Sequence, residues 1–206
     1  MHDCHQTGSR CVTKDELIAF EESIAEEFNA GKIRYPIHLD NGNEDALIGI
    51  FKSVKPRDWV FVSWRGHYKA LLKGVPPEEL RAAIHRGESM ALWFDRHRIY
   101  GSAIVGGMVP VALGTAMAIK RSGSDEHVWL FIGDMAAESG IVYEVTKYAA
   151  NFYLPLTIVV EDNGVSVCTK TEDAWGFISE SISERTIRYQ YLSKYPHAGA
   201  GKRIQF

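Results

Sequence analysis

Two near-continuous apolar runs, at residues 128–132 and 154–160, constrain the fold of this chain more than any other feature. Such runs are typical of strands that are buried on both faces of a sheet. The segment between them, from about Glu138 to Phe152, has the apolar spacing of a helix. Because a strand followed by a helix and a second strand forms a right-handed crossover, this order predicts two parallel strands.

The same alternation of helix and strand signals covers most of the chain. A capping box at Thr13-Lys14-Asp15-Glu16 predicts the start of a helix that ends near Gly31. Further helices are predicted over residues 44–54, from 76 to about 87, and through 118–119 after a loop of small residues at 101–107, with strands over 59–63 and 186–192. We therefore predict an α/β fold: a doubly wound, mostly parallel sheet with helices on both faces. We expect one domain over residues 1–206, of which 1–12 form a loose tail.

Composition and charge exclude several classes of protein. The net charge of −3 gives no basic footprint for nucleic acid, and no apolar run reaches the length of a membrane span. The first residues lack the charged-then-apolar order of a secretory signal, so we expect a cytoplasmic protein. Three cysteines make no disulfide framework, and the cluster of His2, Cys4, His5 and Cys11 matches no standard zinc spacing.

Polar turns follow both of the apolar runs. Gly133-Asp134 comes after the first and Asp162-Asn163-Gly164 after the second. In a doubly wound sheet, ligands bind outside the carboxyl ends of the strands. A carboxylate and an amide oxygen there suit Mg²⁺, which binds few protein ligands together with phosphate and water. The simpler interpretation is that Asp and Asn-Gly only form the turns.

Several motifs in a fixed order resemble one enzyme family. Gly133 to Gly140, the helix, Leu154-Pro155-Leu156 and Glu161 to Gly164 look like the thiamine diphosphate motif, in which Asn163 follows Asp134 by 29 residues. The other matching stretches are Pro36 to Leu39, Gly42-Asn43-Glu44, Ser63 to His67, Ser89-Met90 and Ile104 to Pro110. Over residues 15–176 the chain resembles, in shortened form, the α subunit of thiamine diphosphate-dependent dehydrogenase E1 components that act on 2-oxo acids or acyloins such as acetoin.

The resemblance implies a role for each matching residue. Asp134, the Asn163 side chain and the Val165 carbonyl would hold Mg²⁺. The diphosphate would contact Arg65 and the N–H groups of Met135 and Ala136, which follow Gly133. Ala103 and Val105 would lie beside the aminopyrimidine, and Trp64 stands where the family often has Tyr. His38, His67 and His197 would be the catalytic histidines, with His38 and His197 relaying protons.

The resemblance also implies that this chain holds half of an active site. A β-type E1 subunit would supply the glutamate that activates the pyrimidine ring, in an α₂β₂ assembly. The acyl fragment would then pass to a lipoyl acceptor protein. No nucleic-acid or membrane partner is expected.

Other interpretations and several departures stand beside this one. The motif would also be present in a transketolase-like or decarboxylase half-protein, or in a non-catalytic remnant that binds thiamine diphosphate or a nucleotide. A dinucleotide-binding domain is disfavoured, because this chain has no G-x-G-x-x-G turn that opens a helix. His38 could be a core histidine, Arg65 and His67 an exposed turn, and Gly106-Gly107 a packing device. Met135 stands where the family has a glycine. If the backbone there needs a positive φ, the methionine side chain would be strained. Asp162 and Ala91 replace the usual Asn and His, and an internal deletion before the last strand would bring His197 to the active-site loop.

Overall fold

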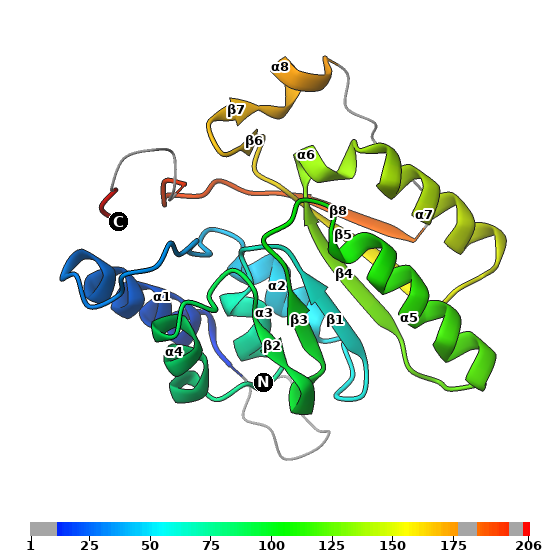
Figure 1. Cartoon of the computed structure of the whole chain (residues 1–206), viewed down its shortest axis with the longest axis horizontal. Helices are drawn as coiled ribbons and strands as arrows, with labels where there is room; N and C mark the ends of the chain where they lie inside the picture. Colours follow the sequence, from blue (N-terminus) through cyan, green and yellow to red (C-terminus); the bar gives the residue numbers. More distant parts are fainter. Residues whose placement is uncertain (1–11, 177–184, 198–203) are drawn as a thin grey trace.

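A six-stranded sheet forms the centre of the molecule (Figure 1). The structure is a computed structural model, and it describes residues 12–176, 185–197 and 204–206. The strands follow the order β2–β3–β1–β4–β5–β8, and every neighbouring pair is parallel except β2 with β3. Their bounds are β1 Trp59–Val62, β2 Trp93–Phe94, β3 Ile99–Gly101, β4 Val128–Gly133, β5 Leu156–Asp162 and β8 Thr186–Gln190. The predicted α/β fold with a mostly parallel sheet is confirmed.

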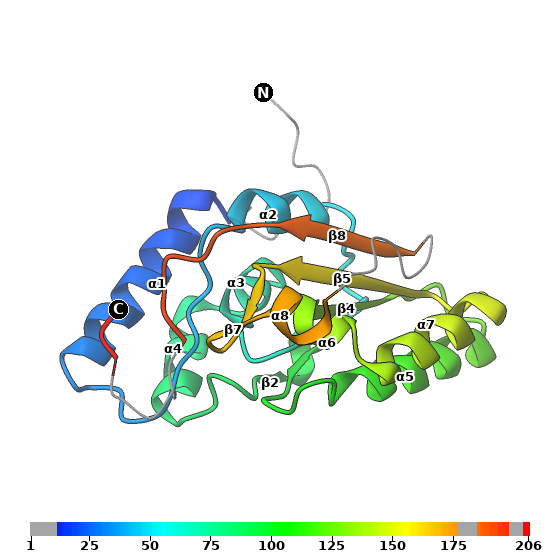
Figure 2. The same ribbon diagram turned by 90° about the horizontal axis from the view of Figure 1, so that it is seen from above.

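Helices cover both faces of this sheet (Figure 2). The helices α1 Lys14–Asn29, α2 Glu44–Phe51, α3 His67–Leu72 and α4 Pro77–His85 lie on one side, whereas α5 Met108–Ser122 and α7 Gly140–Asn151 lie on the other. Shorter elements complete the chain: η1 Asp95–His97, α6 Asp134–Ala137, the hairpin of β6 Val165–Ser166 with β7 Thr169–Lys170, and α8 Thr171–Trp175. The hairpin, α6 and α8 lie at one end of the sheet (Figure 1).

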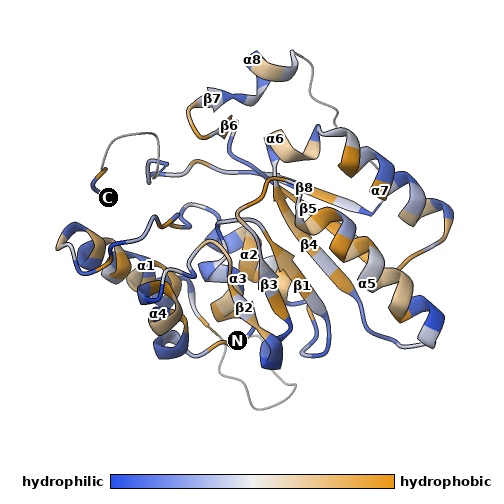
Figure 3. Ribbon diagram, viewed as in Figure 1, coloured by the Kyte–Doolittle hydropathy of each residue, from blue (hydrophilic) through white to orange (hydrophobic). Residues whose placement is uncertain are grey.

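Alternating side chains divide the apolar core into two layers. In β1, Val60 and Val62 join the layer of α1, α3 and α4, whereas Phe61 joins the layer of α5 and α7. In β4, Phe131 points to the first layer, where it stacks on Phe51 of α2 at 5.6 Å, and Leu130 points to the second. Because both faces are covered, β1 and β4 at the centre of the sheet consist almost entirely of apolar residues (Figure 3).

Local sequence signals fix the helix ends. Thr13 and Glu16 form the predicted capping box, in which the Thr13 hydroxyl accepts from the Glu16 N–H and the Glu16 carboxylate accepts from the Thr13 N–H. α5 ends at Gly123, whose φ of 69° lies in the left-handed region that glycine adopts easily. α2 ends at Phe51, three residues before the predicted end at Val54.

The structure differs from the sequence prediction at β5 and around α6. β5 begins after Pro155 and continues through Glu161 and Asp162, two residues that the sequence places in a turn. They stay in the strand because they pair with Tyr189 and Gln190 of β8. Local sequence signals do not predict α3, α6, β2, β3, the β6–β7 hairpin or α8.

Two further expectations concern the N-terminal Cys and His cluster and membrane-spanning helices. The Cys and His cluster at residues 2–11 lies outside the described residues. Within the described residues, no helix is both long enough and apolar enough to cross a membrane.

Candidate functional site

A pocket that is open to solvent lies at the carboxyl edge of the parallel strands. Each parallel strand contributes to its wall through the residues that end or follow it. The lining residues are Ser63, Trp64, Arg65, Val105, Gly106, Ile132, Gly133, Asp134, Met135, Ala136, Glu161, Asn163, Val165, Ser166 and Tyr191. Nine of the predicted site residues are among them: Trp64, Arg65, Val105, Gly133, Asp134, Met135, Ala136, Asn163 and Val165.

Asp134 and Asn163, the two candidate metal ligands, lie in this one pocket. They meet because β4 and β5 are adjacent and parallel, with Gly133 paired to Glu161. The Asp134 side chain is buried, and its carboxylate accepts a hydrogen bond from the Thr171 hydroxyl of α8. The Asn163 amide oxygen accepts from the Val165 N–H at 3.3 Å.

The charge of Asp134 lacks a cationic partner among the described side chains. Burial raises the pKa of its carboxyl above the ordinary value, the Thr171 hydrogen bond lowers it, and the charge of Asp162 raises it further. A divalent cation would supply the missing positive charge. Together the Asp134 carboxylate, the Asn163 amide and the Val165 carbonyl form the kind of oxygen-donor set that Mg²⁺ binds.

Met135 takes its place without backbone strain. It lies in α6, and the described non-glycine residues with positive φ are Arg98, Tyr153 and Val167. The strain expected from replacing a glycine therefore does not arise at Met135. Its sulfur accepts a hydrogen bond from the indole of Trp175 at 3.1 Å, which joins α8 to the pocket wall.

Arg65 brings a positive charge to the opposite wall. Its Nε donates to the Leu39 carbonyl at 3.3 Å. No carboxylate of the described chain lies within ion-pair distance of its guanidinium. Since the planar guanidinium fork suits phosphate oxygens, an anionic ligand is the natural partner for this charge.

His38, His197 and Trp64 form an aromatic cluster next to the pocket. The two imidazole rings lie 4.2 Å apart between centroids, and each is about 6 Å from the Trp64 ring. His38 and His197 are outside the pocket lining, although their neighbour Trp64 is part of it. Among the described residues, neither buried Nδ1 atom has a hydrogen-bond partner. Burial lowers the pKa of His38 to about 4. The pKa of His197 is also lowered, mainly by burial and to a lesser extent by the charge of Arg65.

The stability of the unliganded chain should fall between pH 6.5 and pH 4 because of His38. The folded state binds this proton with a pKa of about 4 and the unfolded state with one of about 6.5, so acid favours unfolding. At about 1.4 kcal/mol for each pKa unit, the loss is about 3 kcal/mol at pH 4, and it vanishes above pH 6.5. Urea unfolding from pH 4 to 7 measures it, and His38→Asn should flatten the profile. An unchanged profile in this variant would contradict the assignment.

His67 lies away from the pocket, beneath α1. It is fully buried, its Nδ1 is 3.0 Å from the Glu21 carboxylate, and its Nε2 is 2.8 Å from the Ser89 hydroxyl. Burial alone would lower the pKa of His67, but the charge and hydrogen bond of Glu21 raise it. The structure therefore does not bring His67 to the reacting groups of the pocket, and its predicted catalytic role stays a prediction.

The loop after β3 is largely solvent-exposed. Val105 lines the pocket with 57% of its surface exposed, and its neighbour Ile104 is 74% exposed. Ala103 is exposed and is not part of the pocket wall. The side of the pocket where the aminopyrimidine is expected is thus open in this chain.

Glu161, Tyr191 and Thr171 are site residues that sequence reasoning did not single out. Glu161 accepts hydrogen bonds from Tyr189 at 2.7 Å and from Asn43 at 3.2 Å. Its position directly before the Asp162-Asn163 turn was visible, but its burial and its partners were not. Thr171 reaches Asp134 because the β6–β7 hairpin reverses the direction of the chain, and no local sequence motif predicts this hairpin.

Comparison with known proteins gives a consistent set of relatives. The family model of the dehydrogenase E1 component matches residues 13–190. The pyruvate dehydrogenase E1 component subunit alpha of Rickettsia prowazekii is 32% identical over 168 residues, which cover 76% of this chain and 52% of that protein. Its namesake from Zymomonas mobilis is 31% identical, with 75% and 47% covered.

A plant relative has the same degree of similarity. The chloroplastic pyruvate dehydrogenase E1 component subunit alpha-3 of Oryza sativa subsp. japonica is 31% identical over 177 residues, which cover 75% of this chain and 42% of that protein. The chain thus spans about half the length of the curated relatives that it matches.

Proposed function

This chain belongs to the dehydrogenase E1 component family, and on this basis we propose that it is the α-type subunit that binds thiamine diphosphate and Mg²⁺. The proposed reaction is decarboxylation or cleavage of a 2-oxo acid or acyloin, with transfer of the acyl fragment to a lipoyl acceptor. The observation that carries the proposal is the shared pocket of Asp134, Asn163 and Arg65. It combines a magnesium donor set with a guanidinium that suits phosphate.

The chemistry of the donors supports Mg²⁺ over a transition metal. Within the described residues, no group of three or more His, Cys, Asp or Glu side chains could hold a metal ion. A cation in the pocket would depend on one carboxylate, one amide, one carbonyl and the oxygens of a ligand. This is how Mg²⁺ is bound beside phosphates.

The chain's own residues bind and orient in the proposed reaction. Asp134, Asn163 and the Val165 carbonyl would hold the metal, and Arg65 would bind the diphosphate oxygens. Thiamine diphosphate, when bound, supplies the nucleophilic carbon and the electron sink for cleaving the bond next to a carbonyl. Burial holds His38 neutral at physiological pH, and its Nδ1 has no partner among the described residues, so this nitrogen is available for a hydrogen bond with a ligand.

An incomplete pocket supports the proposal of a β-type partner. Val105 and Ile104 expose apolar surface beside the pocket. A β-type E1 subunit covering this side would exclude water and supply the activating glutamate. An α₂β₂ assembly is the proposed form, and the cytoplasm its proposed location.

The full chain alone is expected to bind but not to turn over. Mixed with thiamine diphosphate and Mg²⁺, it should show magnesium-dependent binding by calorimetry but little CO₂ release from pyruvate or other 2-oxo acids. Addition of a β-type E1 subunit from the same organism should restore release, because the partner completes the site.

Two results would redirect this proposal. Robust decarboxylation by the chain alone would contradict the split site and would favour a self-sufficient decarboxylase. Cofactor binding without CO₂ release in the presence of a β-type subunit would favour a non-catalytic binding protein.

A further inference from the structure

Lys69 is a fully buried lysine whose ammonium joins three separate segments of the chain. Its Nζ lies 2.8 Å from Asp40 Oδ1 and 2.8 Å from Glu161 Oε1, and it donates to the Arg65 carbonyl at 3.0 Å. An ammonium group has three N–H donors, and here each donor has its own acceptor. A buried charge is tolerated only when it is paired in this way.

All three contacts lead to the wall of the pocket. Arg65 and Glu161 are both lining residues; Arg65 follows β1 and Glu161 lies near the end of β5, the two strands that flank β4. Asp40 follows Leu39, whose carbonyl accepts the hydrogen bond from Arg65 Nε. Lys69 therefore holds the Arg65 backbone directly, and through Asp40 it also holds the acceptor of the Arg65 side chain.

We propose that Lys69 is a positioning residue, which fixes the Arg65 guanidinium for the phosphate oxygens of the ligand. The proposal rests on the proposed function for the identity of that ligand. Lys69 does not line the pocket and so acts through Arg65. Its long stem lets one cation cross-link the start of α3, the segment before α2 and the end of β5, which a short side chain could not do.

A purely stabilising ion pair would have the same contacts but different consequences. It would lower the free energy of unfolding when broken and would leave Arg65 ordered. A positioning role instead makes the contribution of Lys69 to binding depend on Arg65. The coupling between the two residues is therefore the quantity to measure.

A double-mutant cycle on the full chain measures that coupling. Binding of thiamine diphosphate with Mg²⁺, and of inorganic pyrophosphate with Mg²⁺, is followed by calorimetry for Lys69→Met, Arg65→Ala and the pair. We expect each single variant to bind at least about tenfold more weakly, which equals about 1.4 kcal/mol. The pair should bind no more than about twofold more weakly than Arg65→Ala. Additive losses would overturn the proposal.

Lys73→Met is the matched control. Lys73 also belongs to this region and donates to two backbone carbonyls, of Lys55 and Pro56, at 2.9 and 2.8 Å, but none of these residues lines the pocket. Its replacement should leave ligand affinity within about twofold of the unmodified chain, because no pocket residue moves with it. An equal loss of affinity in both lysine variants would also count against the proposal.

A further variant and an NMR measurement separate an effect on folding from an effect on Arg65. Lys69→Met leaves the buried carboxylates of Asp40 and Glu161 without their shared cation, so the combination of Asp40→Asn with Lys69→Met, which removes one of the two charges, is made as well. The amide oxygen that Asp40→Asn introduces can still accept from the Tyr68 N–H. Order of the Arg65 Nε–H group is measured by NMR relaxation in the unliganded chain, with the signal assigned by its loss in Arg65→Ala. It should fall in both Lys69 variants and stay unchanged in Lys73→Met.

The NMR measurement separates the two proposals. If the unmodified chain binds neither ligand but Arg65 loses order in the Lys69 variants, Lys69 does order Arg65, whereas the role of that order in phosphate binding and the cofactor assignment both fail. If the unmodified chain binds and Arg65 order is unaffected by Lys69→Met, the positioning role fails and the cofactor assignment holds.

Discussion

Replacing Asp134 with asparagine should weaken Mg²⁺-dependent binding of thiamine diphosphate by at least about 100-fold. The carboxylate is the one charged oxygen donor of the candidate metal site, and loss even of groups that only orient a metal ligand costs about 10- to 100-fold. The fold should survive, because an asparagine oxygen can still accept from the Thr171 hydroxyl. Removal of a buried charge without an ion-pair partner among the described side chains should leave the stability of the unliganded chain equal or higher.

Calorimetry and thermal unfolding of the same samples test this expectation. Asp173→Asn, an exposed acid on α8, is the matched control and should bind like the unmodified chain. If Asp134→Asn retains affinity within about threefold, the metal site is not where we place it. A simultaneous loss of folding would mean that Asp134 has a structural task instead.

Replacing His67 with alanine should lower the free energy of unfolding by about 3 to 5 kcal/mol. The substitution leaves the buried Glu21 carboxylate without the histidine that pairs with it at 3.0 Å, and the cost of an uncompensated buried charge is of this size. The Ser89 hydroxyl loses its partner at the same time. Urea unfolding at pH 7 measures the change.

The chain contains a matched surface pair for comparison. His85 of α4 contacts Glu27 of α1 at 2.6 Å, but it is exposed, so His85→Ala should cost about 1 kcal/mol or less. Equal losses in the two variants would refute the structural role of His67. Normal stability of His67→Ala with loss of turnover in the α–β complex would support the catalytic role inferred from the motif.

The main strands and the candidate metal site were predictable because their signals are local. The apolar residues of β4 announce a buried strand, and Asp134 and Asn163 stand at strand ends where a parallel sheet gathers its ligands. The capping box at Thr13 marks a helix start within four residues. Each of these inferences needs only a short window of sequence.

The remaining elements were hidden because their causes are distant in sequence. β3 has three residues, too few to show a period, and it is a strand because it pairs with β1. α3 buries two polar residues, His67 and Lys69, so its buried face does not show an apolar pattern in the sequence. Those two polar residues are tolerated there because Glu21 and Asp40 neutralise them from 46 and 29 positions away.

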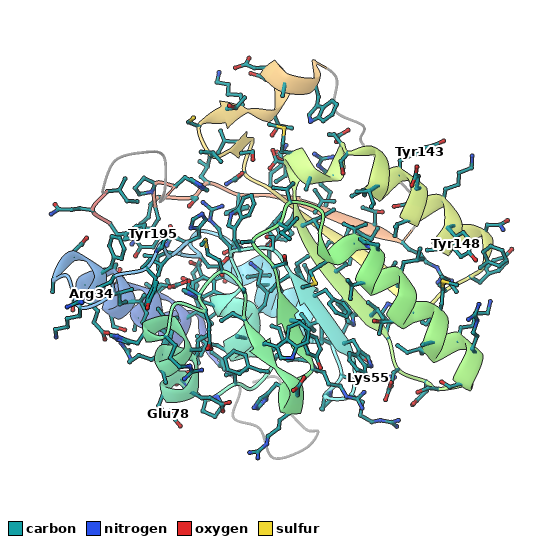
Figure 4. All side chains as sticks on the ribbon, in the orientation of Figure 1. Arg34, Lys55, Glu78, Tyr143, Tyr148 and Tyr195 are labelled. Atoms are coloured by element: carbon teal, nitrogen blue, oxygen red, sulfur yellow. The ribbon has the colours of Figure 1, made fainter. Side chains whose placement is uncertain are left out.

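The outer surface of α7 carries two exposed aromatic residues. Tyr143 and Tyr148 project from this helix and remain 62% and 41% exposed (Figure 4). Their aromatic character favours burial in a sequence analysis, whereas in the structure Val142, Val145 and Ala149 fill the core. These three residues share one face of the helix, which packs on the sheet and α5, so the two tyrosines point outward.

The pocket wall is assembled from residues between Ser63 and Tyr191, because every parallel strand ends at it. Parallel neighbours are distant in sequence, and such pairings form slowly. During synthesis, the wall can close only after β8 has left the ribosome, because Tyr191 follows that strand. Until then, the wall lacks Tyr191, and β5 has no partner on its outer side, because β8 is the strand that pairs with it there.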